Sequence, residues 1–223
     1  MRAPKRQVPL ATQVSAEMLR LVQEGDWKVG ERIPGEFELS EEMGVSRSTI
    51  RESLRGLVGV GILEPRVGDG TYVRARDEIG GVLMRDEAHS LTDTLDARAG
   101  LEAACARLAA SNRDESDLTH MEDALERRFL AHDALEIEAY VAADAEFHHA
   151  VIGASHNPIL IRLHSAVAHL MDSSIARTSG LPEDPAVGQL HRELLAAIRG
   201  RDADLANALA YQMIASVKPD SAE

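Results

Sequence analysis

The chain has 223 residues, of which 44% are hydrophobic and only 3% aromatic, and its formal net charge is −13. This length suffices for one large domain or two ordinary ones, and the single cysteine, Cys105, excludes an intramolecular disulfide. No apolar run reaches the length of a membrane span, and the basic segment 1–7 is not followed by the apolar core of a secretory signal. We therefore expect a cytoplasmic protein with no membrane partner.

The acidic charge is unevenly distributed along the chain. Residues 1–76 hold 12 Lys and Arg and 11 Asp and Glu, whereas residues 77–223 hold 12 and 26. An excess of acidic groups opposes attraction to nucleic acid, but here the excess lies outside the N-terminal part. A basic surface for an anionic partner can therefore still exist in residues 1–76.

Residues 10–76 carry signals for three helices and a hairpin. Apolar spacing predicts a first helix over 10–24 and a second over 36–43, and glycines follow both. Ser46 is a suitable N-cap for a third helix that ends at about residue 60. Two β-prone segments within 62–73 flank a glycine-containing turn and predict a β-hairpin.

The third helix has two different faces. Ile50, Leu54 and Leu57 form an apolar stripe, while the other face carries Arg47, Ser48, Arg51 and Arg55. A basic helix face can be a plain solvated surface. In a helix-turn-helix, however, the first turn of the second helix enters the major groove of DNA, where Arg can pair with guanine. The hairpin that follows would then be a wing.

The N-terminal segment resembles the GntR-type winged-helix transcription regulators over about residues 8–76. The matching pieces are KVGERIP at 28–34, ELS at 38–40, GVSRSTIRESL at 44–54 and GDGTYV at 68–73. We expect the DNA-binding residues to be Arg47, Ser48, Thr49, Arg51, Arg55, Arg66, Gly68 and Gly70. The resemblance implies that Arg47 and Arg51 contact bases. It also implies that Ser48 and Thr49 hold phosphates or base edges, and that Gly68 and Gly70 let the wing enter the minor groove.

Two positions depart from the family pattern. Phe37 stands where the family often has Arg, and the acidic Asp69 stands at the wing tip. These departures concern individual DNA contacts and not the fold.

After a linker at 77–89, with Gly80 and Gly81 as its expected flexible point, we predict about six helices. They begin near Leu91, after the cap Asp114, near Ala134, after the cap Asn157, near Ala186 and near Ala203. Their apolar stripes predict an antiparallel all-helical bundle over 90–223. The expected fold class is thus mainly α, with a winged helix-turn-helix over 1–76 followed by the bundle.

Polar residues interrupt the apolar stripes of two of these helices. Asp144 and His148 lie among the inward residues Ile137, Tyr140, Val141, Phe147, Val151 and Ile152, and His191 lies on the apolar face of a later helix. One Asp and two His that face inward from different helices are suited to a divalent metal ion. The alternative is a hydrogen-bonded Asp–His pair with His191 unrelated to it.

Arg98 and Glu102 share the inward face of the first bundle helix. The Arg98 guanidinium could bind an effector carboxylate through two parallel hydrogen bonds, or it could form an ion pair with Glu102 one turn away. We expect His164 to belong to the core. No role is assigned to His89, His120, His132, His156 or His169.

The bundle resembles the FCD effector-binding domain of the FadR-type branch of GntR regulators over about residues 90–217. The matching pieces are DAEFHH at 144–149, ASHNP at 154–158 and HRELLAAI at 191–198. The metal-binding members have one Asp and three His. Asp144, His148 and His191 fill three of these positions, and Met213 stands at the fourth. The resemblance therefore implies a divalent metal, zinc, nickel or manganese, held by three protein groups plus water or effector. Because a thioether is a poor ligand for such an ion, the alternatives are a reduced metal affinity or a pocket that works without metal.

The two resemblances together imply a transcription regulator, most often a repressor, that binds a pseudo-palindromic operator in double-stranded DNA as a homodimer. A small organic acid bound near Arg98 and Glu102 would control its DNA affinity. One alternative is a regulator that responds to the metal alone. Another is a metal-dependent enzyme built on Asp144, His148 and His191, but the sequence offers no separate general base or nucleophile, so we expect no enzyme.

Overall fold

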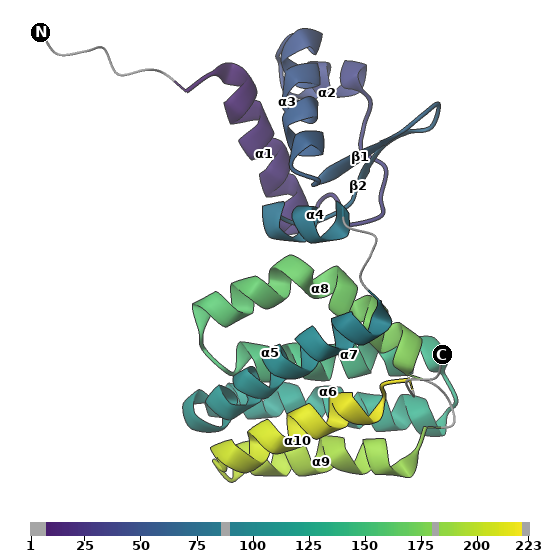
Figure 1. Cartoon of the computed structure of the whole chain (residues 1–223). Helices are drawn as coiled ribbons and strands as arrows, with labels where there is room; N and C mark the ends of the chain where they lie inside the picture. The colour runs from purple at the N-terminus through teal and green to yellow at the C-terminus, as the bar shows by residue number, and fades with distance from the viewer. Residues whose placement is uncertain (1–7, 86–89, 180–182, 220–223) are drawn as a thin grey trace, which may run out of the picture. The chain divides into compact units, whose positions relative to one another are not determined.

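The computed structural model describes residues 8–85, 90–179 and 183–219, and the chain divides into two compact units, Met1–Glu87 and Ala88–Glu223 (Figure 1). Within the described residues there are ten helices and one two-stranded sheet. The expected fold class, a winged helix-turn-helix followed by a helical bundle, is confirmed. None of the helices in the described ranges is both long enough and apolar enough to cross a bilayer.

The N-terminal unit contains α1 (Leu10–Glu24), α2 (Glu36–Glu42), α3 (Arg47–Gly59), β1 (Leu63–Arg66), β2 (Gly70–Val73) and α4 (Glu78–Arg85). Ser46 caps α3 as predicted, since its Oγ accepts a hydrogen bond from the Thr49 amide. α3 packs against both α1 and α2. Its residues Ile50, Leu54 and Leu57 are buried in the core of this unit, so the opposite face of α3 is free to meet a partner.

The wing is held by backbone pairing and by a glycine. β1 and β2 are antiparallel with Leu63 opposite Val73, and the Ile33 amide also donates to Thr71 O at 2.9 Å. Gly70 has a φ of +142°, and a Cβ built on it would lie 2.4 Å from Nε of Arg32. The hairpin therefore requires glycine at position 70 for its own packing.

The expectation of a flexible point at Gly80 and Gly81 is wrong. Both glycines lie inside α4, and both are buried. A Cβ on Gly81 would lie 2.3 Å from the carbonyl oxygen of Val60, and one on Gly61 would lie 2.4 Å from Gly81 O. The glycines serve close contact between two backbone segments, a function that the sequence does not distinguish from flexibility.

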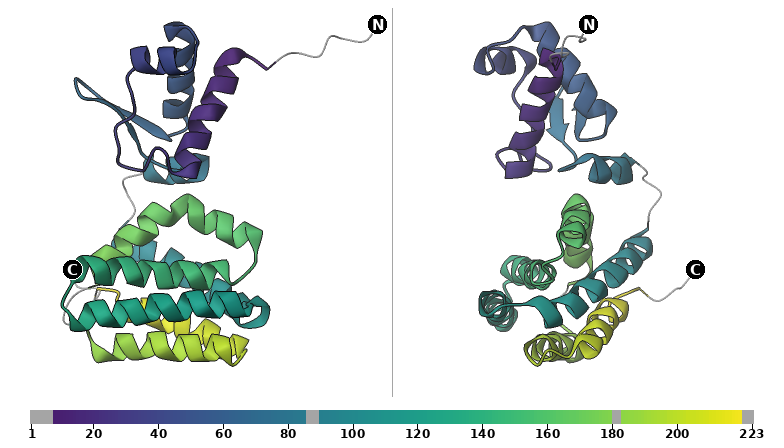
Figure 2. Two further views of the ribbon diagram at one scale, coloured as in Figure 1. Left: turned by 180° about the vertical axis from the view of Figure 1, so that it is seen from behind. Right: turned by 90° about the vertical axis from the view of Figure 1, so that its left-hand side faces the viewer.

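The C-terminal unit contains α5 (Leu91–Asn112), α6 (Glu115–Asp133), α7 (Ile137–Gly153), α8 (Pro158–Thr178), α9 (Pro185–Arg199) and α10 (Ala203–Ser216). Asp114 and Asn157 cap α6 and α8, as predicted. α10 packs along α5, and α7 along α6. The right-hand view of Figure 2 looks nearly along several of these helices and shows them as a bundle.

Small residues set the spacing of the bundle. Ala103, Ala106, Ala109 and Ala110 of α5 are buried in its main core, where the absence of large side chains lets neighbouring helices approach closely. One predicted inward residue is wrong: Ile137 is 45% exposed, because it is the first residue of α7 and lies beyond the packed part of the helix.

Candidate functional site

The first candidate surface is the exposed side of α3. Arg47, Ser48, Arg51 and Arg55 are all exposed, while Thr49 is half-buried. The Ser48 and Thr49 hydroxyls lie 2.8 and 2.9 Å from Oγ of the cap Ser46. The predicted DNA-binding residues of α3 therefore form one continuous polar surface at the start of the helix.

An acidic residue that sequence reasoning missed organises the two predicted base-contacting arginines. Arg51 donates from Nε to Glu36 Oε1 at 2.9 Å and from Nη2 to Oε2 at 2.6 Å, and Arg47 Nη2 lies 4.0 Å from the same carboxylate. The hydrogen bond from Arg51 lowers the pKa of Glu36. The side chains of Arg47 and Arg51 remain 60% and 50% exposed, so both are open to an incoming ligand.

The wing carries a second set of predicted contacts. Arg66 is exposed and stacks its guanidinium on the Tyr72 ring, 3.9 Å from the centroid. The acidic tip residue Asp69 accepts a hydrogen bond from the Tyr72 hydroxyl at 2.8 Å, which occupies one of its oxygens. Gly68 is exposed with a φ of +77° and open space around it. The wing tip thus tolerates close approach of another molecule at Gly68.

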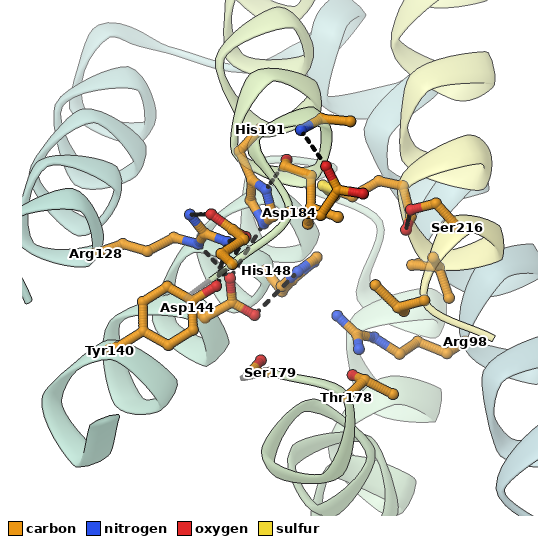
Figure 3. A pocket seen from close by; sticks show the side chains of 16 residues that line it. Arg98, Arg128, Tyr140, Asp144, His148, Thr178, Ser179, Asp184, His191 and Ser216 are labelled. Atoms are coloured by element: carbon orange, nitrogen blue, oxygen red, sulfur yellow. Dashed lines mark hydrogen bonds and ion pairs between the residues drawn. The ribbon is translucent and has the colours of Figure 1, made fainter. Parts of the chain in front are cut away.

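The second candidate site is a cavity of about 290 Å³ inside the bundle, lined from α5, α6, α7, α9 and α10 and from the ends of the α8–α9 connection. Asp144, His148 and His191 meet there, as predicted, with one potential ligand atom of each lying within 4.8 Å of the others. Figure 3 shows Arg98 and Arg128 on opposite sides of the pocket, with Asp144 and His148 between them. This volume lies at the lower end of the range for ligand pockets and suits a small molecule.

Hydrogen bonds orient both imidazoles toward Asp144. His148 Nδ1 lies 2.5 Å from Glu102 Oε2, and His191 Nδ1 lies 2.8 Å from the carbonyl of Val187. Each Nδ1 can therefore carry the proton, which leaves Nε2 with a lone pair. The Nε2 atoms lie 3.8 Å (His148) and 3.2 Å (His191) from Asp144 oxygens. His191 Nε2 is buried and hydrogen-bonds to none of the described residues.

The donor set fits a divalent metal ion. Both histidines hold Nδ1 against an acceptor, a backbone carbonyl for His191 and a carboxylate for His148, and direct Nε2 toward Asp144, which is the arrangement of metal-ligating histidines. The pKa of His148 is lowered, chiefly by burial, and this favours the neutral form that binds metal. Met213 lines the cavity and is 2% exposed. Its thioether is a weak ligand for zinc, nickel or manganese, so the set comprises three strong donors.

Arg98 and Glu102 form the ion pair that was the alternative to effector binding. Arg98 Nε donates to Glu102 Oε1 at 2.5 Å, and both side chains are nearly fully buried. Burial raises the pKa of Glu102, but Arg98 and His148 lower it more, so the net shift is downward. Glu102 is absent from the cavity lining. Arg98 lines the cavity, and its Nη groups hydrogen-bond to none of the described residues. The pair thus fixes Arg98 with its free amino groups on the pocket side.

A second buried guanidinium, Arg128 of α6, was missed. It donates from Nε to Asp144, from Nη2 to the Tyr140 hydroxyl at 2.8 Å and to Glu183, and from Nη1 to Glu183 at 3.2 Å. Arg128 is 1% exposed. Burial raises the pKa of Asp144, but the histidines and Arg128 lower it more, so the carboxyl group stays ionised. A sequence signal existed: Met121, Leu125 and Arg128 follow helical spacing.

The buried charges of this region do not cancel. Three carboxylates, those of Glu102, Asp144 and Glu183, face two guanidiniums, those of Arg98 and Arg128. With neutral imidazoles the formal charge is −1, which opposes an anionic ligand, whereas a divalent ion would change it to +1.

The remaining histidines lie elsewhere. His164 is buried, and burial lowers its pKa to about 4, in line with the expected core position. His156 was assigned no partner, but it converges with Asp114 and Asp117, its Nε2 lying 2.7 Å from Asp117 Oδ2. This group lies at the surface, and one of its members, Asp114, is the cap of α6.

Both halves of the chain match known protein families. Residues 10–73 match the bacterial regulatory proteins of the gntR family, and residues 93–216 match the FCD domain. The galactonate operon transcriptional repressor of Escherichia coli (strain K12) is 34% identical over 203 residues, which cover 86% of this chain and 88% of that protein. The Glc operon transcriptional activator of the same strain is 31% identical over 175 residues, covering 75% and 69%.

A solved structure has the same architecture. The Streptococcus agalactiae GntR structure superimposes with a TM-score of 0.56 and 27% sequence identity, covering 93% of this chain and 98% of that one.

Proposed function

Because the chain belongs to the GntR family of bacterial regulatory proteins and carries an FCD domain, we propose that it is a transcription repressor controlled by a small organic acid. The operator is a pseudo-palindromic double-stranded DNA site, bound by a homodimer in the cytoplasm. Two-fold symmetry of the protein matches two-fold symmetry of the half-sites. The family consists of regulators and not of enzymes, and among the relatives is a repressor of a galactonate operon.

In the DNA-binding domain, α3 is the recognition helix. Its first turn carries the exposed Arg47 and Ser48 and the half-buried Thr49, and the exposed Arg51 and Arg55 follow at one-turn spacing. Arg51 can exchange its two hydrogen bonds with Glu36 for two bonds to guanine, because both arrangements use the same pair of parallel donors. Arg66 and Gly68 of the wing would lie over the neighbouring minor groove.

On the sensing side, the observation that carries the proposal is Arg98. Its amino groups face a small buried pocket and have no partner among the described residues, while Glu102 fixes the rest of the guanidinium. A free guanidinium fork in such a place is suited to a carboxylate. We therefore assign an organic acid of the hydroxycarboxylate class as effector, the class to which galactonate belongs.

Asp144, His148 and His191 would hold a divalent metal, zinc, nickel or manganese, beside this fork. The ion would supply the positive charge that converts the pocket from net negative to net positive. Within the chain itself, Glu102 positions both Arg98 and His148, and Val187 orients His191. The effector must bind the DNA-free conformation of the protein more tightly than the DNA-bound conformation. The ratio of these two effector affinities sets the largest decrease in operator affinity that the effector can cause.

The test uses the full-length protein and a DNA duplex selected by it from a random pool. Fluorescence anisotropy measures operator affinity with and without D-galactonate or L-lactate, in zinc-loaded and in EDTA-treated protein. We expect an acid to weaken DNA binding at least tenfold in the zinc-loaded protein, and to have no effect in the Arg98→Ala variant. If neither acid changes DNA affinity at millimolar concentration, the proposed sensing function fails.

The buried three-residue donor set favours one alternative, a regulator for which the metal itself is the signal. The same experiment separates the two. An operator affinity that changes on addition of EDTA alone, and not on addition of either acid, would select the metal-responsive regulator.

A further inference from the structure

We propose that Glu183 is a specificity-determining residue that restricts the pocket to monocarboxylic acids by pairing with Arg128. The inference rests on the proposed function, since it concerns the ligand of the same pocket. It assigns a role to two residues that no family motif in the sequence marked.

The two guanidiniums of the pocket differ in how many of their nitrogens already donate a hydrogen bond to the protein. In Arg128, all three nitrogens already donate: Nε to Asp144, Nη1 to Glu183 and Nη2 to both Tyr140 and Glu183. In Arg98, only Nε has a protein partner among the described residues. The pocket therefore contains two buried cations but offers only one of them to a ligand.

Residues of three helices surround the Glu183 carboxylate. Arg128 comes from α6, Tyr140 of α7 donates its hydroxyl hydrogen to Glu183 Oε1 at 2.8 Å, and Gly188 of α9 leaves room for the carboxylate. A Cβ on Gly188 would lie 2.9 Å from Glu183 Oε2. The Glu183 side chain is only 8% exposed. The contact thus has the fork-to-fork form by which Arg binds a carboxylate ligand.

The pairing with Arg128 puts a negative charge at one end of the pocket. Glu183 lines the cavity and contacts Arg128, and Arg98 lies across the pocket from Arg128 (Figure 3). A ligand whose carboxylate is bound at the Arg98 side would direct its far end toward Glu183. A hydroxyl there can donate a hydrogen bond to the Glu183 carboxylate, whereas a second carboxylate would meet a like charge with no free guanidinium to accept it.

The experiment compares acids that differ at the far end. D-galactonate and galactarate share one carbon chain and differ only in a terminal CH₂OH or carboxylate, and L-lactate and L-malate form a smaller pair. Isothermal titration calorimetry on zinc-loaded full-length protein gives the affinity ratio for each pair. We expect wild type to prefer the monocarboxylate at least tenfold. Glu183→Gln keeps the side-chain size and a hydrogen-bond acceptor but removes the negative charge that faces Arg128. The variant should bind the dicarboxylates more tightly, so that the preference for the monocarboxylate falls tenfold or more.

The control is Glu193→Gln, which makes the same substitution on the exposed face of α9. Glu193 is exposed, lies outside the cavity lining and pairs with no guanidinium among the described residues. An unchanged ratio in Glu183→Gln, or an equal change in Glu193→Gln, overturns the inference. If wild type binds none of the four acids, the proposed function fails separately. The inference is then decided by the variant: dicarboxylate binding gained only by Glu183→Gln supports it, and no gain overturns it.

Discussion

Replacing Arg128 by Met should destabilise the C-terminal unit strongly. Asp144 and Glu183, with side chains 7% and 8% exposed, would lose the guanidinium that each of them contacts, and Tyr140 would lose a hydrogen bond. Removing one partner of a buried ion pair costs about 3–5 kcal/mol, because the other charge stays buried and uncompensated. With a urea m-value of about 2 kcal/mol/M, the unfolding midpoint should fall by roughly 1.5–2.5 M.

The two units can be followed separately in one urea titration. The single tryptophan, Trp27, belongs to the N-terminal unit, so its fluorescence reports unfolding there, whereas most helical residues lie in the C-terminal unit and dominate the far-ultraviolet circular dichroism. EDTA is present throughout and the protein concentration is fixed, since metal binding and association also shift the apparent stability. We expect the circular dichroism transition to move and the Trp27 transition to stay in place.

The neighbouring residue provides the control. Arg127 lies on the same helix and pairs with Glu146 at 2.6 Å, but both side chains are more than half exposed. Its replacement by Met should cost less than about 1 kcal/mol. If Arg128→Met and Arg127→Met shift the midpoint equally, the buried ion network does not stabilise the bundle and the reasoning is refuted.

Three further predictions concern the other sites. Arg51→Ala should weaken specific operator binding by roughly 1–3 kcal/mol in an anisotropy titration, because the pairing with guanine is lost. His191→Ala should abolish stoichiometric metal in the purified protein, as measured by elemental analysis, because only two strong ligands remain. Gly81→Ala should destabilise the N-terminal unit by about 1–3 kcal/mol, seen in the Trp27 transition, because its Cβ would lie 2.3 Å from Val60 O.

Each of these has an outcome that contradicts it. Full operator affinity in Arg51→Ala would remove this residue from the groove. Full metal occupancy in His191→Ala would discard the proposed metal site. An unchanged Trp27 transition in Gly81→Ala would mean that α4 can move away from the Val60 backbone without loss of stability.

Much of the site was predictable because its residues interrupt regular patterns. Asp144 and His148 stand one helical turn apart on an apolar stripe, and His191 stands on another, so each signals a polar group directed into a core. Arg128 lies on a stripe too, but it is adjacent to the exposed Arg127. Two consecutive arginines on a charged helix are usually solvent-exposed, so the sequence does not single out Arg128. Glu183 follows no periodicity, because it lies in an irregular connection.

The sequence by itself determined the features that depend on neighbours within about one helical turn: the caps at Ser46, Asp114 and Asn157, the apolar stripes, and the polar first turn of α3. Only the tertiary structure decided which buried charges meet. Arg128 and Glu183 are 55 positions apart, and Gly61 and Gly81, whose backbones are in close contact, also belong to different segments of the fold. Such partners are chosen by helix packing, since a buried charge takes whichever opposite charge the fold brings within hydrogen-bond distance.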